Sequence, residues 1–168
     1  MGRQILVDAN TIRASRLFVN DTEVTDAIEE IATLDGLTSS VAELNLVDNQ
    51  PASVTFVVGA EVSDIINVAG QVKDAAGTDM ANPCALKFYL ADDSAGLDPS
   101  TTAPAQGISI GTDGALIEHT DNLSGVLITE ADGDFDINIE NQTTTLTFYL
   151  VMIMPNGSLQ ISDAITFA

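Results

Sequence analysis

The chain has 168 residues, 45% of them hydrophobic, and a formal net charge of −20, because 25 acidic side chains face five basic ones. This length suffices for one core of ordinary size, or for a small domain with an appended arm. Binding to phosphate needs clustered Lys and Arg, so the charge argues against nucleic acid and anionic membranes as partners. Aromatic residues are scarce and Trp is absent, so the core is expected to consist of Val, Ile, Leu and Ala with a few Phe.

Residues 1–23 are predicted to form an extended basic arm. Three of the five basic residues lie in the first 16 positions, where only Asp8 opposes them. A positive tip on a negative body suits docking onto an acidic surface. Residues 17–23 are expected to form a hairpin with its turn at Asn20-Asp21. The predicted docking residues are Arg3, Ile5, Val7, Arg13 and Arg16.

Residues 24–50 contain a 13-residue unit written twice, VTDAIEEIATLDG followed by LTSSVAELNLVDN. Apolar residues recur every three or four positions, which is the helical period. Each unit is too short to be stable alone in water, so its apolar stripe must be buried against copies of itself or against the domain that follows. The positions predicted to mediate oligomerisation are Val24, Ile28, Ile31, Leu34, Leu37, Val41 and Leu44.

From residue 51 the hydrophobic period changes to two, and turn residues separate short runs rich in Val, Thr, Ile, Phe and Tyr. Strands are predicted near Ser53–Val58, Glu61–Lys73, Leu86–Ala91, Gly107–Gly111, Ala115–His119, Gly125–Glu130, Phe135–Glu140, Thr145–Met154 and Ser158–Phe167. Asp92–Gln106 reads as a polar loop. Turns every 8–12 residues are typical of an antiparallel immunoglobulin-like β-sandwich. The fold class predicted is therefore mostly β, with this sandwich over residues 51–168.

Few residues suggest chemistry. Four carboxylates, Glu130, Asp132, Asp134 and Asp136, could supply calcium ligands, although the spacing only partly follows an EF-hand loop. Acidic residues alternating with core residues around a turn explain the same pattern. Asp92-Asp93 with Asp98 is a weaker calcium candidate.

His119 is the only histidine, and no nucleophile motif accompanies it. Cys84 is the only cysteine, which excludes an internal disulfide, and a buried position is expected for it. No enzyme activity, resident metal or cofactor is therefore expected. No stretch has the ~20 apolar residues of a membrane span, and residues 1–20 lack the apolar core of a signal peptide.

Several segments resemble those of tailed-bacteriophage virion proteins. Leu17–Thr25, Leu34–Thr38 and Val41–Asp48 are similar to the "VNGTEVT…LDGVTATAAELNLLDG" repeats of fibres and head decorations, with Asp21 where Gly is usual. The C-terminal part resembles a domain often found behind those repeats. Its matching segments are Val72–Gly77, Phe88–Asp93, Ile110–Gly114, Thr129–Asp134 and Thr147–Val151.

This resemblance implies a homotrimeric structural protein without enzyme activity, made in the host cytoplasm and located in the virion. The leading hypothesis is a capsid decoration (cement) protein or short head fibre whose partner is the major capsid protein. The arm would dock on the capsid surface, the repeat would assemble the copies, and the sandwich would project outward. The alternative is a tail-fibre or virion-surface adhesion module whose immunoglobulin-like domain binds a host-surface glycan.

Overall fold

The computed structural model describes residues 18–19, 22–23, 49–142 and 145–168. The chain falls into two compact units, residues 1–40 and 41–168, and each is considered by itself. In the first unit, β1 (Phe18–Val19) pairs antiparallel with β2 (Thr22–Glu23). This pairing agrees with the hairpin predicted at residues 17–23, whose expected turn at Asn20-Asp21 lies outside the described residues.

Two sets of predicted residues lie outside the described part of the chain, which leaves the arm and the helical repeat as predictions. The first set is Arg3, Ile5, Val7, Arg13 and Arg16. The second is Val24, Ile28, Ile31, Leu34, Leu37, Val41 and Leu44.

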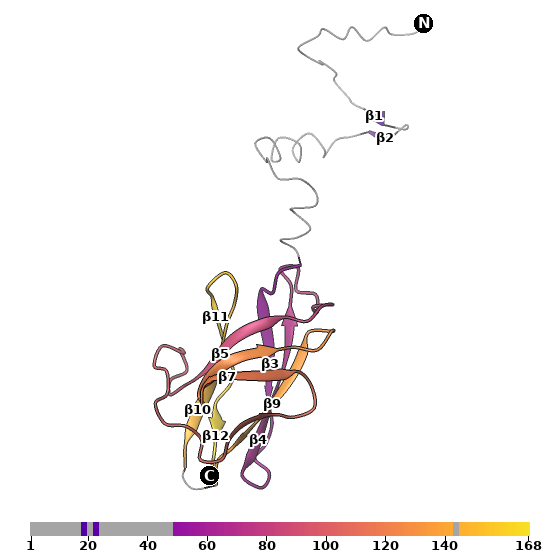
Figure 1. The fold of residues 1–168 in the computed structure, drawn as a ribbon. Coiled ribbons are helices and arrows are strands. Elements are labelled where there is room, and N and C mark those ends of the chain that lie inside the picture. The colour runs from indigo at the N-terminus through magenta and orange to yellow at the C-terminus, as the bar shows by residue number, and fades with distance from the viewer. Residues whose placement is uncertain (1–17, 20–21, 24–48, 143–144) are drawn as a thin grey trace, which may run out of the picture. The chain divides into compact units, whose positions relative to one another are not determined.

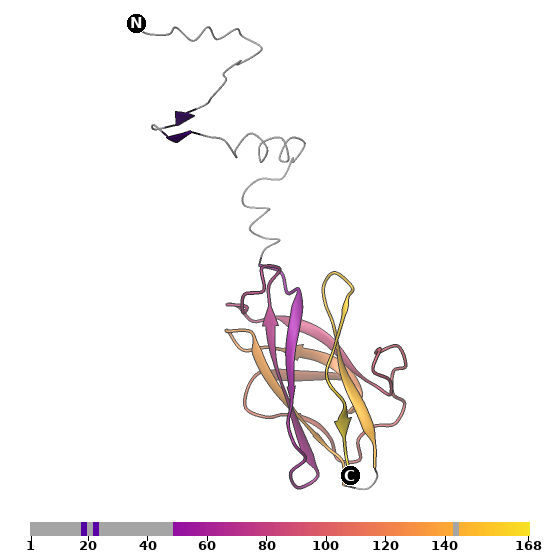
Figure 2. The ribbon, with the colours of Figure 1, turned by 180° about the vertical axis from the view of Figure 1, so that it is seen from behind.

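The second unit contains two antiparallel sheets (Figures 1 and 2). The smaller sheet has the order β3 (Ser53–Val58), β4 (Ile65–Lys73), β9 (Asp134–Glu140), β6 (Gly107–Ile110). The larger sheet has the order β11 (Leu159–Ile161), β10 (Thr147–Ile153), β5 (Ala85–Ala91), β8 (Ser124–Ile128), β7 (Ala115–Thr120), and β12 (Ile165–Thr166) also pairs with β10. The prediction of a mostly β, antiparallel fold is confirmed.

One hydrophobic core lies between the sheets. Side chains alternate strictly between buried and half-buried along β4 and β9, as expected for strands with one face toward a core. The largest fully buried side chains come from both sheets and include Phe135, Ile137, Phe148, Leu150 and Phe167. Each sheet therefore buries the apolar face of the other.

β10 is buried on both of its faces. Leu150, Val151 and Met152 are all fully buried, and β10 lies between β11 and β5 in the larger sheet. The loop after β5 covers the outer face, since a Cβ built on Gly96 would lie 3.0 Å from Val151 Cγ2. The Tyr89 hydroxyl donates to the Gly96 carbonyl at 2.5 Å and holds this loop against the sheet.

Most predicted strands agree with the structure to within one or two residues, but two differ by more. The strand expected at Glu61–Lys73 begins only at Ile65, because Ser63 and Asp64 have φ of 53° and 65° and form a two-residue hairpin turn. The strand expected at Ser158–Phe167 is divided into β11 and β12. Between them the Ser162 hydroxyl accepts the Leu150 amide at 2.9 Å, so a side chain replaces a backbone partner there.

Candidate functional site

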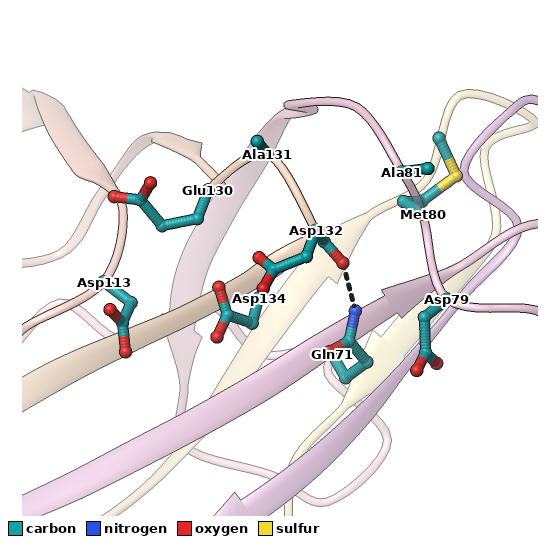
Figure 3. Close-up of a pocket in the computed structure, with 9 residues that line it drawn as sticks. All are labelled: Gln71, Asp79, Met80, Ala81, Asp113, Glu130, Ala131, Asp132 and Asp134. Carbon is teal, nitrogen blue, oxygen red and sulfur yellow. Dashed lines mark hydrogen bonds between the residues drawn. The ribbon is translucent and has the colours of Figure 1, made fainter.

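A pocket of about 640 Å³ lies where three connecting loops meet the strands β4 and β9 (Figure 3). β4 contributes Gln71, and the β6–β7 loop contributes Asp113. The remaining lining residues come from the β4–β5 loop, the β8–β9 turn and the start of β9. We call this the acidic pocket, and its lining is Gln71, Asp79, Met80, Ala81, Asp113, Glu130, Ala131, Asp132 and Asp134.

The turn between β8 and β9 positions most of the carboxylates. The Glu130 amide donates to the Asp134 carbonyl at 2.9 Å, and the Gly133 amide donates to the Glu130 carbonyl at 3.1 Å. Gly133 has φ of 83°, and a Cβ there would lie 2.7 Å from Met80 Cβ, so only glycine fits. Gln71 Nε2 donates to the Asp132 carbonyl at 2.8 Å and fixes the turn against β4 (Figure 3).

Asp132 and Asp134 interact directly within the acidic pocket. The pKa of Asp134 is raised to about 6, chiefly by the hydrogen bond that its protonated form makes to Asp132, and further by burial and the charges of Asp132, Asp113 and Glu130. The same hydrogen bond lowers the pKa of Asp132. Asp134 Oδ1 is buried and accepts no hydrogen bond from the described residues. The pair can therefore take up one proton slightly below neutral pH.

Asp136, the fourth predicted calcium ligand, instead accepts hydrogen bonds from a neighbouring loop and from β4. Its carboxylate accepts the amides of Thr112 at 2.6 Å and Asp113 at 2.8 Å, and also Asn67 Nδ2 at 2.8 Å. Burial alone would raise the pKa of Asp136. Together these hydrogen bonds lower it by more than burial raises it, so the pKa lies below its ordinary value. Asp136 thus ties the β6–β7 loop to β9 and does not line the acidic pocket.

Asp113 lines the acidic pocket, although it was not among the predicted calcium ligands. The sequence marks Asp113-Gly114 only as a turn, some 20 positions before Asp134. The turn comes close because the Asp136 amide donates to the Asp113 carbonyl at 3.0 Å. A periodic pattern of β-strands does not reveal which loops meet at the end of a sandwich.

The acidic pocket offers carboxylates and one amide side chain to a ligand, which suits proton uptake and hydrogen bonding to hydroxyl or cationic groups. Within residues 49–142 and 145–168, no three His, Cys, Asp or Glu side chains are arranged so that they could hold a metal ion. The calcium set is thus divided: Glu130, Asp132 and Asp134 line the acidic pocket, whereas Asp136 binds loop amides.

The other candidate residues are separate from the acidic pocket. His119 lies on β7 and is exposed. Asp93 Oδ1 accepts the amides of Ala95 and Leu97, so it caps its own loop. Cys84 is 6% exposed, as expected, and burial raises the pKa of its thiol despite a hydrogen bond with Thr129.

The described part of the chain is thus an antiparallel β-protein with one core and an acidic pocket at the meeting point of its loops. It contains no helix long and apolar enough to cross a membrane. Comparison with protein-family models and with curated proteins found no match.

Proposed function

We propose that this chain is a structural virion protein of a tailed bacteriophage, either a capsid decoration (cement) protein or a short head fibre. It assembles as a homotrimer through the repeat, binds the major capsid protein through the basic arm, and presents the sandwich to solvent. It is made in the host cytoplasm and ends on the capsid surface. The proposal rests on the resemblance of its segments to those of virion proteins and on the contacts between these segments in the fold.

The observation that carries the proposal is that the five resembling segments of the C-terminal part contact one another in two groups. In the first group, the Val72 amide donates to the Gly133 carbonyl at 2.9 Å, and the Gly114 amide donates to Glu130 Oε1 at 3.2 Å. These bonds connect Val72–Gly77, Ile110–Gly114 and Thr129–Asp134. In the second group, Phe88–Asp93 and Thr147–Val151 belong to the paired strands β5 and β10. The resembling segments therefore lie beside one another in the fold, which supports a shared architecture.

The strand order supports an immunoglobulin-like sandwich. The order β3-β4-β9-β6 corresponds to A-B-E-D, and β11-β10-β5 corresponds to G-F-C. The hairpin β7-β8 then occupies the edge beside strand C, where variable-type domains carry extra strands. Such a domain is suited to display on a virion surface, because its stability comes from its own core.

The test is sedimentation with purified heads of the phage that encodes the chain. We expect the full chain to be trimeric by light scattering and to sediment with heads. Residues 51–168 should be a folded monomer that stays in the supernatant. Changing Arg3, Arg13 and Arg16 to Glu should abolish head binding without changing the trimer mass. If the truncated protein still trimerises, the repeat is not the oligomerisation element. If a chain without the arm still binds heads, the arm is not the docking element.

The acidic pocket favours one alternative, an adhesion module that binds a host-surface glycan. Carboxylates and Gln71 can accept and donate hydrogen bonds to sugar hydroxyl groups, and the pocket volume is within the range of ligand sites. Binding on a glycan array that is lost in an Asp132→Ala variant would support this alternative. A glycan-binding protein that does not bind heads would replace the decoration hypothesis.

A further inference from the structure

One edge of the smaller sheet lacks the features that normally protect an edge strand. β3 has the sequence SVTFVV, six residues with no charge, proline or glycine. Within the described residues it is hydrogen-bonded on one side only, to β4. Long, uncharged edge strands pair readily with additional strands, so natural proteins usually shorten, charge or bend them.

The other sheet edges are protected. β7 carries an irregularity between Glu118 and Thr120, and both residues are exposed. β6, β11 and β12 have only four, three and two residues. The unprotected character of β3 is therefore specific to that strand and is not a general property of the fold.

The register of β3 identifies the free backbone groups. The Gly59 amide donates to the Asn67 carbonyl at 2.8 Å, and Val58 lies opposite Val68. Hydrogen-bonded pairs alternate with non-bonded pairs in an antiparallel ladder. The amides and carbonyls of Val54, Phe56 and Val58 therefore point away from β4, toward the position of an additional strand.

Apolar side chains at this edge are incompletely covered. Phe56 and Val58 pack against the core but are only partly buried. On the outer face, Val57 is 65% exposed. An additional strand would hydrogen-bond the free backbone groups and shield these side chains from water.

We propose that β3 accepts an extended strand from the basic arm of a second copy of this chain, with Gln4–Val7 as the added strand. Charge complementarity favours this occupant: residues 1–16 carry three Arg and one Asp, whereas residues 49–168 carry 16 acidic side chains and two Lys, a net charge of −14. Gln4–Val7 is uncharged and three of its four side chains are apolar, and β3 is likewise uncharged and mostly apolar. Addition of a strand to a sheet edge is a common mode of peptide recognition. The source of the strand rests on the homo-oligomer of the proposed function: Gln4–Val7 would pair with the second copy, and the Arg side chains of the same arm would dock on the capsid.

The test uses a synthetic peptide of residues 1–16 and the full chain with Ile5→Asp, which weakens competition from its own arm. We expect saturable binding of the peptide. N-methylation of Ile5 and Val7, or of Gln4 and Leu6, removes the amides on one side of the strand only. One of these two peptides should bind at least about tenfold more weakly, while the other binds like the unmodified peptide. Equal binding of both, or no binding of the unmodified peptide, would overturn the inference.

Two receptor variants locate the binding edge. Val57→Lys places a charge on the outer face of β3 and should weaken peptide binding at least about tenfold. Val62→Lys adds the same charge beyond the end of β3, at a residue that is 68% exposed, and should leave binding unchanged. Equal effects of the two variants would indicate charge alone and overturn the assignment to β3.

Donation between copies has its own readout. Refolding the full chain carrying Ile5→Asp together with the full chain carrying Val57→Lys should give cross-links from the arm of the second variant to β3 of the first, because each supplies the element that the other lacks. Both variants keep the repeat and can form mixed trimers without donation, so it is the absence of these cross-links that would overturn donation between copies. If heads still bind the chain while the peptide does not, the inference fails and the proposed function stands. If the peptide binds while heads do not bind the chain, the inference stands and the proposed capsid-binding function fails.

Discussion

The ring of Phe135 lies directly over the backbone of Gly70, and a Cβ built on Gly70 would meet the ring Cζ at 2.2 Å. The two residues are opposite each other on β9 and β4. The Phe135 ring also contacts Phe56 edge-on, with ring centroids 6.4 Å apart. A glycine in the middle of a central strand thus makes room for an aromatic ring that reaches across three strands.

Gly70→Ala should lower the free energy of unfolding by about 1–3 kcal/mol, because the Phe135 ring must leave its position in a closely packed core. Denaturant unfolding measures the change. The double variant Gly70→Ala with Phe135→Leu should lose less stability than the sum of the single variants, since the smaller side chain leaves space for the methyl group. Additive effects would show that the two side chains do not compete for one space.

Asp136→Asn should destabilise the sandwich by about 1–3 kcal/mol, because the carboxylate accepts charge-assisted hydrogen bonds from the amides of Thr112 and Asp113. The pKa of Asp136 is lowered in the folded state. Its contribution is therefore present above the ordinary aspartate pKa and is lost as the pH falls through the folded value. Unfolding measured in acid and at neutral pH checks this, with the exposed Asp121→Asn as control. An equal loss in both variants would contradict the role given to Asp136.

Asp134→Asn should stabilise the protein at neutral pH by about 1 kcal/mol, a figure that allows for screening by solvent. The folded pKa of Asp134 is raised to about 6, so the folded protein holds this proton more tightly than the unfolded chain. That stability is complete below the ordinary aspartate pKa and is lost as the pH rises through about 6.

The measurement for Asp134 is the free energy of unfolding between about pH 5 and pH 7. It should fall over this range in the native sequence and change much less in the variant. The lowered pKa of Asp132 acts at lower pH, where its contribution is lost as the pH falls. Asp98→Asn, at an exposed position outside the pocket, is the matched control. An unchanged slope in Asp134→Asn would contradict the assigned pKa.

Cys84 should react with thiol reagents at least about 100-fold more slowly in the folded protein than in denaturant. Cys84 is 6% exposed and the pKa of its thiol is raised, so both access and the thiolate fraction are low. Absorbance of the released thiol product measures the rate. Fast reaction under native conditions would mean that the end of β5 opens readily.

Much of the fold could be predicted because the strands follow a strict period of two. The predicted strand at residues 53–58 coincides with β3, and most others agree within one to three residues. The errors fell where side chains replace backbone partners or where non-glycine residues adopt positive φ. Ser162 and the Ser63-Asp64 turn are the clearest cases, and neither leaves a mark in hydrophobic periodicity.

The candidate site was less predictable. Glu130, Asp132 and Asp134 are close in sequence, so their proximity in space could be expected. The contribution of Asp113 and the separate role of Asp136 depend on which loops the topology brings together. The free edge of β3 is likewise a property of strand order, which periodicity alone does not determine.

The position of the last residues makes the sandwich a usable scaffold for protein engineering. Phe167 is 1% exposed, and the Ala168 amide donates to Glu61 Oε2 at 3.0 Å, just beyond the end of β3 (Figure 1). A six-residue strand spans roughly 20 Å, so this junction lies at the opposite end of β3 from Ser53, where the chain enters the sandwich. A passenger domain fused after Ala168 would leave from a firmly anchored point, directed away from the N-terminal entry.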